Sequence, residues 1–167
     1  MPDSRNDLST SVTIEVVAPH TADATAVLRA YIDDVASRYY ERPATDAEIE
    51  AALLEHPSGD LVPPTGLFLL AREADQVLGC VGMVQVSADV GEVRRLFVTH
   101  AARGRGVGAL LMGEVERRAR DQGLELLRLD TRADLVEARR LYASLGYDEV
   151  PAFCGGPYSD HWFAKSL

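Results

Sequence analysis

Long apolar segments, clustered cysteines and an excess of basic residues are all missing from this 167-residue sequence. No apolar run approaches the ~20 residues of a membrane span, and the polar residues at the start lack the apolar segment of a signal peptide. The two cysteines, Cys80 and Cys154, have no metal-ligand spacing. These absences predict a cytoplasmic protein with reduced thiols, no membrane partner and no metal site.

Acidic residues outnumber basic ones, with 26 Asp and Glu against 17 Lys and Arg, so the formal net charge is −9. Non-specific binding to nucleic acid needs a basic footprint, and we therefore expect no nucleic-acid partner. An acidic surface favours a cationic ligand, such as a small-molecule amine or the basic end of a peptide.

The chain is long enough for one domain with a sizeable core, and 47% of its residues are hydrophobic. We expect a flexible N-terminal tail over residues 1–10 and a single domain over residues 11–167. The sequence contains no internal repeat and no low-complexity tract.

Hydrophobic periodicity and turn residues predict alternating strands and helices. In the helix from Val107 onward, the pattern places Leu110 inward and Glu116 outward. The expected elements, in chain order, are a strand over 12–17, a helix with a buried face from Ala24 to Val35, a helix begun by a Thr45–Glu48 capping box, hairpin strands over 67–72 and 77–86, a strand over 92–98, a helix from Val107 to Gly123, a strand over 124–130, a helix from a cap at Asp134 to Gly146, and short strands over 149–153 and 161–167.

This order predicts an α+β fold with α/β/α layers. A strand–helix–strand unit over 92–130 implies one parallel pair with a right-handed crossover. The hairpins imply antiparallel pairs elsewhere, so we expect a mixed, mostly antiparallel sheet of six to seven strands with helices on both faces.

The segment Arg103-Gly104-Arg105-Gly106-Val107-Gly108 carries the main functional signal. Its glycines allow a tight turn and a close approach of the backbone to a ligand. The amides at the start of the following helix have no intrahelical partner, and the positive end of the helix dipole lies there. Together with two arginines, these donors predict a site for a diphosphate.

Two known phosphate-binding patterns fit this segment poorly. A Walker-type loop requires Lys-Ser or Lys-Thr, which is missing here. The dinucleotide fingerprint matches at Gly104, Gly106 and Ala109, with Asp130 as the ribose-binding acid. However, Thr99–Arg103 separates the strand from the loop, and only 37 residues follow Asp130. A dinucleotide-binding oxidoreductase therefore stays a remote alternative.

A third pattern covers more of the chain. Arg103-x-x-Gly106-x-Gly108 resembles the R/Q-x-x-G-x-G/A motif of the GNAT superfamily of acyl-CoA-dependent N-acetyltransferases. Glu92–Val98 is similar to that family's fourth strand, Leu127–Thr131 to its fifth, and Ala138–Tyr147 to its A-x-x-L-Y-x-x-x-G-F/Y helix end. The resemblance extends over residues 67–150 and adds a splay to the expected parallel pair.

The resemblance implies acetyl-CoA as cosubstrate. Its pyrophosphate would lie on the backbone of Arg103, Gly104, Arg105, Gly106, Val107 and Gly108. Its pantetheine arm would pair with backbone groups near Leu96, Phe97 and Val98.

For the chemistry, the resemblance implies that Tyr142 protonates or hydrogen-bonds the leaving sulfur, and that Glu92 removes a proton from the amine. His161 and Tyr158 are weaker candidates for the base. Many family members carry Asn where this chain has Asp134, so no cofactor contact is assigned there.

The expected activity is direct transfer of an acetyl group to a primary amine in a ternary complex. A non-catalytic acyl-CoA-binding or sensor module on the same fold is the alternative, and the family makes a homodimer plausible.

Overall fold

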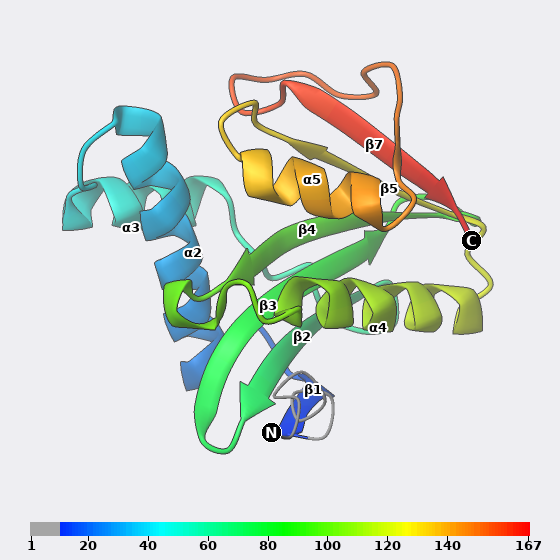
Figure 1. Cartoon of the computed structure of the whole chain (residues 1–167), viewed down its shortest axis with the longest axis horizontal. Helices are drawn as coiled ribbons and strands as arrows, with labels where there is room; N and C mark the ends of the chain where they lie inside the picture. Colours follow the sequence, from blue (N-terminus) through cyan, green and yellow to red (C-terminus); the bar gives the residue numbers. More distant parts are fainter. Residues whose placement is uncertain (1–10) are drawn as a thin grey trace, which may run out of the picture.

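The computed structural model describes residues 11–167, so the tail expected over residues 1–10 lies outside the described residues. The strands and helices follow one another in the expected order (Figure 1). Within the described part of the chain, no helix is both long and apolar enough to cross a membrane. The elements are β1 (Val12–Val16), α2 (Ala22–Tyr40), α3 (Asp46–Glu55), β2 (Gly66–Glu73), β3 (Gln76–Gln85), β4 (Val90–Val98), the short 3₁₀ helix η1 (His100–Ala102), α4 (Val107–Asp121), β5 (Leu126–Thr131), α5 (Val136–Ser144), β6 (Asp148–Glu149) and β7 (His161–Ser166).

The strands form one sheet in the order β1-β2-β3-β4-β5-β7-β6. Every neighbouring pair is antiparallel except β4 and β5, which are parallel. The predicted mixed, mostly antiparallel sheet with one central parallel pair is therefore confirmed.

The parallel pair separates soon after it begins. Only Val90–Glu92 and Leu126–Arg128 are in register. Further on, β4 continues to pair with β3 as far as Val98, while β5 pairs with β7 as far as Thr131. The sheet consequently opens between the C-terminal halves of β4 and β5 (Figure 1).

A β-bulge interrupts β4 at the point where the sheet opens. Gly82 pairs with Arg94 and Cys80 with Phe97, so Arg95 and Leu96 together lie opposite the single residue Val81. Arg95 has a φ of +60°, which is uncommon for a residue other than glycine. Such bulges redirect side chains and are frequent next to active sites.

Both faces of the central strands are covered. One core cluster joins Leu67, Leu69 and Ala71 of β2 to α4 and to Tyr142 of α5. The other joins Phe68 and Leu70 of β2 to α2. Alternate residues of one strand thus pack against helices on opposite faces, as expected for a sheet between two helical layers.

The local signals for two helices had different outcomes. The capping box at α3 is confirmed, because Thr45 and Glu48 exchange side-chain and backbone hydrogen bonds. The cap predicted at Asp134 is wrong: α5 begins after Leu135 without a side-chain cap. Asp134 instead accepts two hydrogen bonds from Arg132, which satisfies its carboxylate more strongly than a backbone amide would.

Two orientations predicted for α4 are also wrong. Leu110 is 38% exposed, whereas Glu116 is only 7% exposed. The Glu116 carboxylate accepts hydrogen bonds from Tyr147 Oη and Lys165 Nζ, each at 3.1 Å. Burial is tolerated because this carboxylate is both paired and hydrogen-bonded. In place of the strand expected over 149–153, β6 consists of Asp148 and Glu149 alone, so the expectation overlaps with it only at Glu149.

Candidate active site

The opening between β4 and β5 contains a cleft of about 270 Å³. Its walls come from α2, the end of β4, the glycine loop, the first turn of α4, and α5. It brings together eight of the residues predicted to bind the cofactor. These are Leu96, Phe97, Val98, Arg103, Gly104, Gly106, Val107 and Gly108.

The start of α4 lines this cleft, and no side-chain cap accepts a hydrogen bond from its first backbone amides. Gly106 is the N-cap of this 15-residue helix, with a φ of +82°, and has no side chain to accept from the first amides. Gly104 also has a positive φ, of +76°. Because the first amides of a helix point outward and carry the positive end of its dipole, this end of the cleft fits a phosphate group.

The two arginines of the loop have different environments. Arg103 lines the cleft, where it donates to the Val98 carbonyl and to Asp34, both at 3.2 Å. Arg105 is not among the lining residues, and its guanidinium pairs with Glu73 of β2. The Arg105 side chain is therefore directed away from the cleft, which leaves only its backbone available for the predicted role.

A second and larger cavity, of about 540 Å³, lies on the α2–α3 side of the opening. Its walls come from α2, α3, β4, β5 and residues 155–159. Tyr39, Tyr40 and Tyr158 are between 41% and 49% exposed and form an aromatic rim. Tyr39 meets both other rings edge-on, with centroid distances of 5.5 Å and 5.4 Å.

The two cavities share a wall. Tyr31, Val35 and Leu135 line both of them. Arg132, which directly follows β5, links this wall to α2. Its guanidinium donates a hydrogen bond to the Val35 carbonyl at a distance of 2.8 Å. A ligand in each cavity would therefore lie against the same three side chains.

Tyr142 of α5 lies in the core cluster that packs against α4. It is 6% exposed, and its ring packs against Tyr147 and Phe163 with centroid distances of 6.0 Å and 5.8 Å. Burial raises its pKa above the ordinary value, and the charges of Tyr31 and Asp130 raise it further. Among residues 11–167 its hydroxyl has no hydrogen-bond partner, and Tyr142 is not among the residues that line either cavity.

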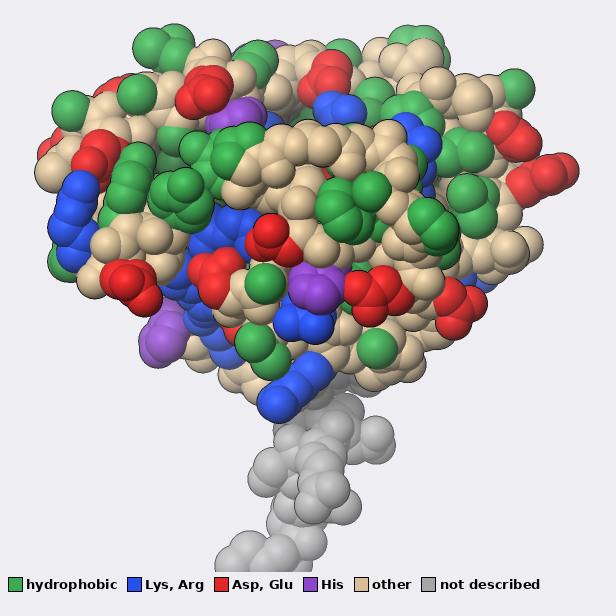
Figure 2. Space-filling model, turned by 90° about the horizontal axis from the view of Figure 1, so that it is seen from above, with side chains coloured by type: hydrophobic (Ala, Val, Ile, Leu, Met, Phe, Trp, Pro, Cys, Tyr) green, Lys and Arg blue, Asp and Glu red, His purple; other side chains and the backbone are tan. Residues whose placement is uncertain are grey.

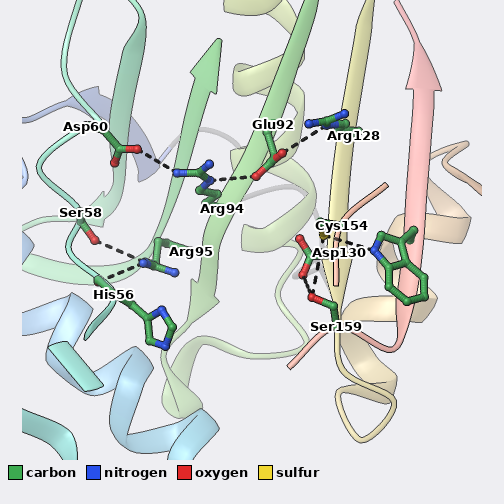
Figure 3. Close-up of polar contacts among 11 residues, drawn as sticks. His56, Ser58, Asp60, Glu92, Arg94, Arg95, Arg128, Asp130, Cys154 and Ser159 are labelled. Atoms are coloured by element: carbon green, nitrogen blue, oxygen red, sulfur yellow. Dashed lines mark hydrogen bonds and ion pairs between the residues drawn. The ribbon is translucent and has the colours of Figure 1, made fainter. Parts of the chain in front are cut away.

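The Glu92 carboxylate is engaged by two arginines. It accepts from Arg94 at 3.0 Å and from Arg128 at 3.2 Å (Figure 3). It is not among the residues that line either cavity. Asp130 does line the larger cavity, and it accepts a hydrogen bond from Ser159 at 2.6 Å. The structure thus brings Asp130, and not Glu92, next to the open space.

Residues 28–147 match the sequence profile of the acetyltransferase (GNAT) family. This chain belongs to the GNAT acetyltransferase family. The match covers α2 from residue 28 onward, α3, the opened strand pair, the glycine loop and α5, which supply most of the walls of both cavities; residues 155–159 of the larger cavity lie outside the match.

Three known proteins illustrate the relationship. An IAA acetyltransferase from Azospirillum brasilense is 32% identical over an alignment of 134 residues, and the match covers 71% of this chain and 86% of that protein. An aminoalkylphosphonate N-acetyltransferase from Salmonella typhimurium is 28% identical over 97 residues, 55% of this chain and 63% of that protein, so that match spans less than two thirds of the relative. The crystal structure of PaiA N-acetyltransferase from Thermoplasma acidophilum in complex with coenzyme A shares the fold, with a TM-score of 0.72, 18% identity and coverage of 93% and 99%.

The weaker candidates within this GNAT site differ in position. Tyr158 lines the larger cavity, whereas the His161 ring nitrogen lies 2.5 Å from Glu149 and is not among the lining residues. Cys80 is fully buried, and burial raises the pKa of its thiol, which disfavours the reactive thiolate.

Sequence reasoning missed Arg95 as a site residue and considered Asp130 only for the dinucleotide pattern. Arg95 lines the larger cavity, beside His56. The available signal was the pair of adjacent arginines 94–95 within a predicted strand, which breaks the alternation expected of regular β-structure.

Proposed function

We propose that this protein is an N-acetyltransferase that transfers an acetyl group from acetyl-CoA to a primary amine, by direct transfer in a ternary complex. The observation that carries the proposal is the pair of cavities that meet at Tyr31, Val35 and Leu135 where the sheet opens. Two separate binding spaces with a common wall suit a reaction in which two substrates must lie in contact.

The smaller cleft fits coenzyme A by the chemistry of its walls. The amides at the start of α4 would hold the pyrophosphate, with Arg103 beside them. The end of β4 no longer pairs with β5, so its backbone would hydrogen-bond the extended pantetheine amides in the manner of an added strand. An amide of β4 near the bulge would polarise the thioester carbonyl.

When bound, acetyl-CoA supplies the activated acetyl group. Tyr142 would donate its phenolic proton to the sulfur that leaves, because its raised pKa keeps the phenol protonated. The amine must lose a proton to attack. Glu92 was the predicted base, but Asp130 has the better position. It lines the larger cavity, which would hold the amine, and its charge raises the pKa of Tyr142.

The relatives support this assignment. The family is one of acetyltransferases, and the relative from Salmonella typhimurium is named as an N-acetyltransferase of an aminoalkylphosphonate, which is a small-molecule amine. The Thermoplasma protein with this fold was crystallised with coenzyme A.

The test combines calorimetric titration with an assay of thiol release. Acetyl-CoA, coenzyme A and NADH are titrated separately, and thiol release is then followed across a panel of primary amines. Binding of the two coenzyme A species together with amine-dependent thiol release is the expected result. Binding without release for any amine would favour a sensor module, and binding of NADH alone would refute the proposal.

A further inference from the structure

The larger cavity contains a guanidinium group that has no acidic partner. Arg95 projects from the β4 bulge and is half-buried among the residues that line this cavity. Its Nη2 donates to the His56 carbonyl at 3.1 Å, and its Nε donates to Ser58 Oγ at 3.3 Å (Figure 3). Both acceptors are neutral, so the positive charge of Arg95 is not compensated by either contact.

The other arginines of this cavity are neutralised. Arg94 pairs with Asp60 and Glu92, at 2.9 Å and 3.0 Å. Arg132 pairs with Asp134 at 2.7 Å. Among residues 11–167, Arg95 forms no ion pair with a carboxylate, and it is therefore the guanidinium in the cavity that is left to bind an anion.

The charge of Arg95 is directed toward the interior of the site. Burial raises the pKa of Tyr31, whereas the positive charge of Arg95 lowers it. Because Tyr31 lines both cavities, an anion on Arg95 would lie close to the place where they meet. The strained backbone at Arg95 fits this role, since conformations of this kind cluster at ligand-binding positions.

The aromatic rim of the larger cavity favours a ligand that also has an apolar part. Tyr39, Tyr40 and Tyr158 keep large exposed ring surfaces at its mouth, and His56 packs edge-on against Tyr158 with a centroid distance of 5.8 Å. Aromatic surfaces of this kind bind planar or apolar groups.

The surface charge of the molecule does not repeat this pattern. Figure 2 shows acidic side chains spread over the face seen from above, with some basic side chains in a hollow between them and others at the edges. The larger cavity itself contains charges of both signs: Arg95 has no acidic partner, and Asp130 and Glu55 line the same cavity without an ion pair to a basic side chain among residues 11–167.

We propose that the acceptor is an amine that also carries an anionic group, a carboxylate or a phosphonate, and that this group binds the Arg95 guanidinium while the apolar part of the acceptor packs on the tyrosine rim. This inference rests on the proposed acetyltransferase function and narrows its acceptor. It adds an anionic group to the cationic amine that the net charge favoured: Arg95 would bind the anion, and Asp130 in the same cavity would face the amine.

The test uses acceptor pairs that differ in the anionic group. The pairs are L-phenylalanine with phenethylamine, and 2-aminoethylphosphonate with ethanolamine, with kcat/KM measured by thiol release. The wild-type enzyme should prefer the anionic member of at least one pair by about tenfold or more, as expected for a hydrogen-bonded ion pair. A phosphonate-only preference identifies the anion as a phosphonate, and a carboxylate-only preference identifies it as a carboxylate.

Arg95→Asn and Arg95→Lys test the residue itself. Asparagine removes the charge and tolerates a positive φ, and lysine keeps the charge. Arg95→Asn should lower kcat/KM for the anionic acceptor about 10- to 100-fold and change that for the neutral amine less than threefold. Arg95→Lys should recover part of the loss. Arg140→Gln, at an exposed arginine outside both cavities, is the control.

The outcomes separate this inference from the proposed function. Equal use of both members of each pair, or an equal loss for both in Arg95→Asn, would overturn the inference and leave the acetyltransferase intact. If no amine supports thiol release, the proposed function fails. Calorimetric titration of L-phenylalanine and 2-aminoethylphosphonate then tests the anion site directly: binding that Arg95→Asn abolishes supports it, and absence of binding refutes it.

Discussion

Substitution Tyr142→Phe separates the chemical role of Tyr142 from its role in packing. The change removes one oxygen from a side chain that is 6% exposed and leaves its ring against Tyr147 and Phe163. Because the hydroxyl has no partner among residues 11–167, its loss breaks no hydrogen bond within the described protein. We therefore expect the melting temperature and the affinity for acetyl-CoA to stay close to those of the wild type.

Turnover should fall by about 10²-fold. General acid catalysis contributes ~10²–10⁴-fold. Burial raises the pKa of Tyr142, which makes the phenol a weaker acid and favours the lower end of this range. A 10²-fold loss corresponds to about 2.7 kcal/mol of transition-state stabilisation. The raised pKa also predicts that loss of activity at alkaline pH does not come from ionisation of Tyr142.

The assay is steady-state thiol release with both substrates varied, and the control is Tyr147→Phe. Tyr147 is 3% exposed, contacts the Tyr142 ring and donates to Glu116 at 3.1 Å. Its substitution should lower the free energy of unfolding by about 1.5–3 kcal/mol and leave kcat within a few-fold of the wild type. An unchanged kcat in Tyr142→Phe, or equal losses in both variants, would refute the assignment of Tyr142 as the acid.

Three further predictions follow from the loop, the core and the α3 cap. Gly106→Val forces a β-branched residue to a φ of +82° and should weaken acetyl-CoA binding about tenfold or more in calorimetry, whereas Gly113→Ala in the same helix should not. Lys165→Met removes the nearer cation of Glu116 and leaves only Arg120, at 3.9 Å, so it should lower the free energy of unfolding in urea by about 2–3 kcal/mol, with partial recovery in the double variant with Glu116→Gln. Arg42 and the Thr45 amide lower the pKa of Glu48 to about 2, so its stabilising contribution is complete above about pH 4.5 and is lost as the pH falls toward 2, which an NMR titration measures as the Glu48 midpoint.

The features that could be predicted from the sequence depend on neighbouring residues. The glycine turn at 104–108, the Thr45 capping box and the period of most apolar residues act within one or two turns of backbone, so they depend little on distant contacts. The hairpin of β2 and β3 and the crossover through α4 then determine most of the strand order.

The features that could not be predicted depend on distant partners. The amphipathic pattern placed Glu116 outward, but its partners Tyr147 and Lys165 lie 31 and 49 residues away. Asp134 is of a residue type that often caps helices, yet its carboxylate accepts hydrogen bonds from Arg132 instead. Arg95 is directed by a bulge whose register depends on β3, and no local pattern specifies that register.

Because both ligands would contact Tyr31, Val35 and Leu135, binding in one cavity is expected to change the affinity of the other cavity for its ligand. Any free energy by which one ligand orders these side chains reappears, with equal size, in the affinity of the other ligand. The factor by which coenzyme A changes the affinity for the acceptor must therefore equal the factor by which the acceptor changes the affinity for coenzyme A. A product that still touches this wall would likewise change how tightly its companion is held, so the three shared side chains link the order of substrate entry to the order of product release.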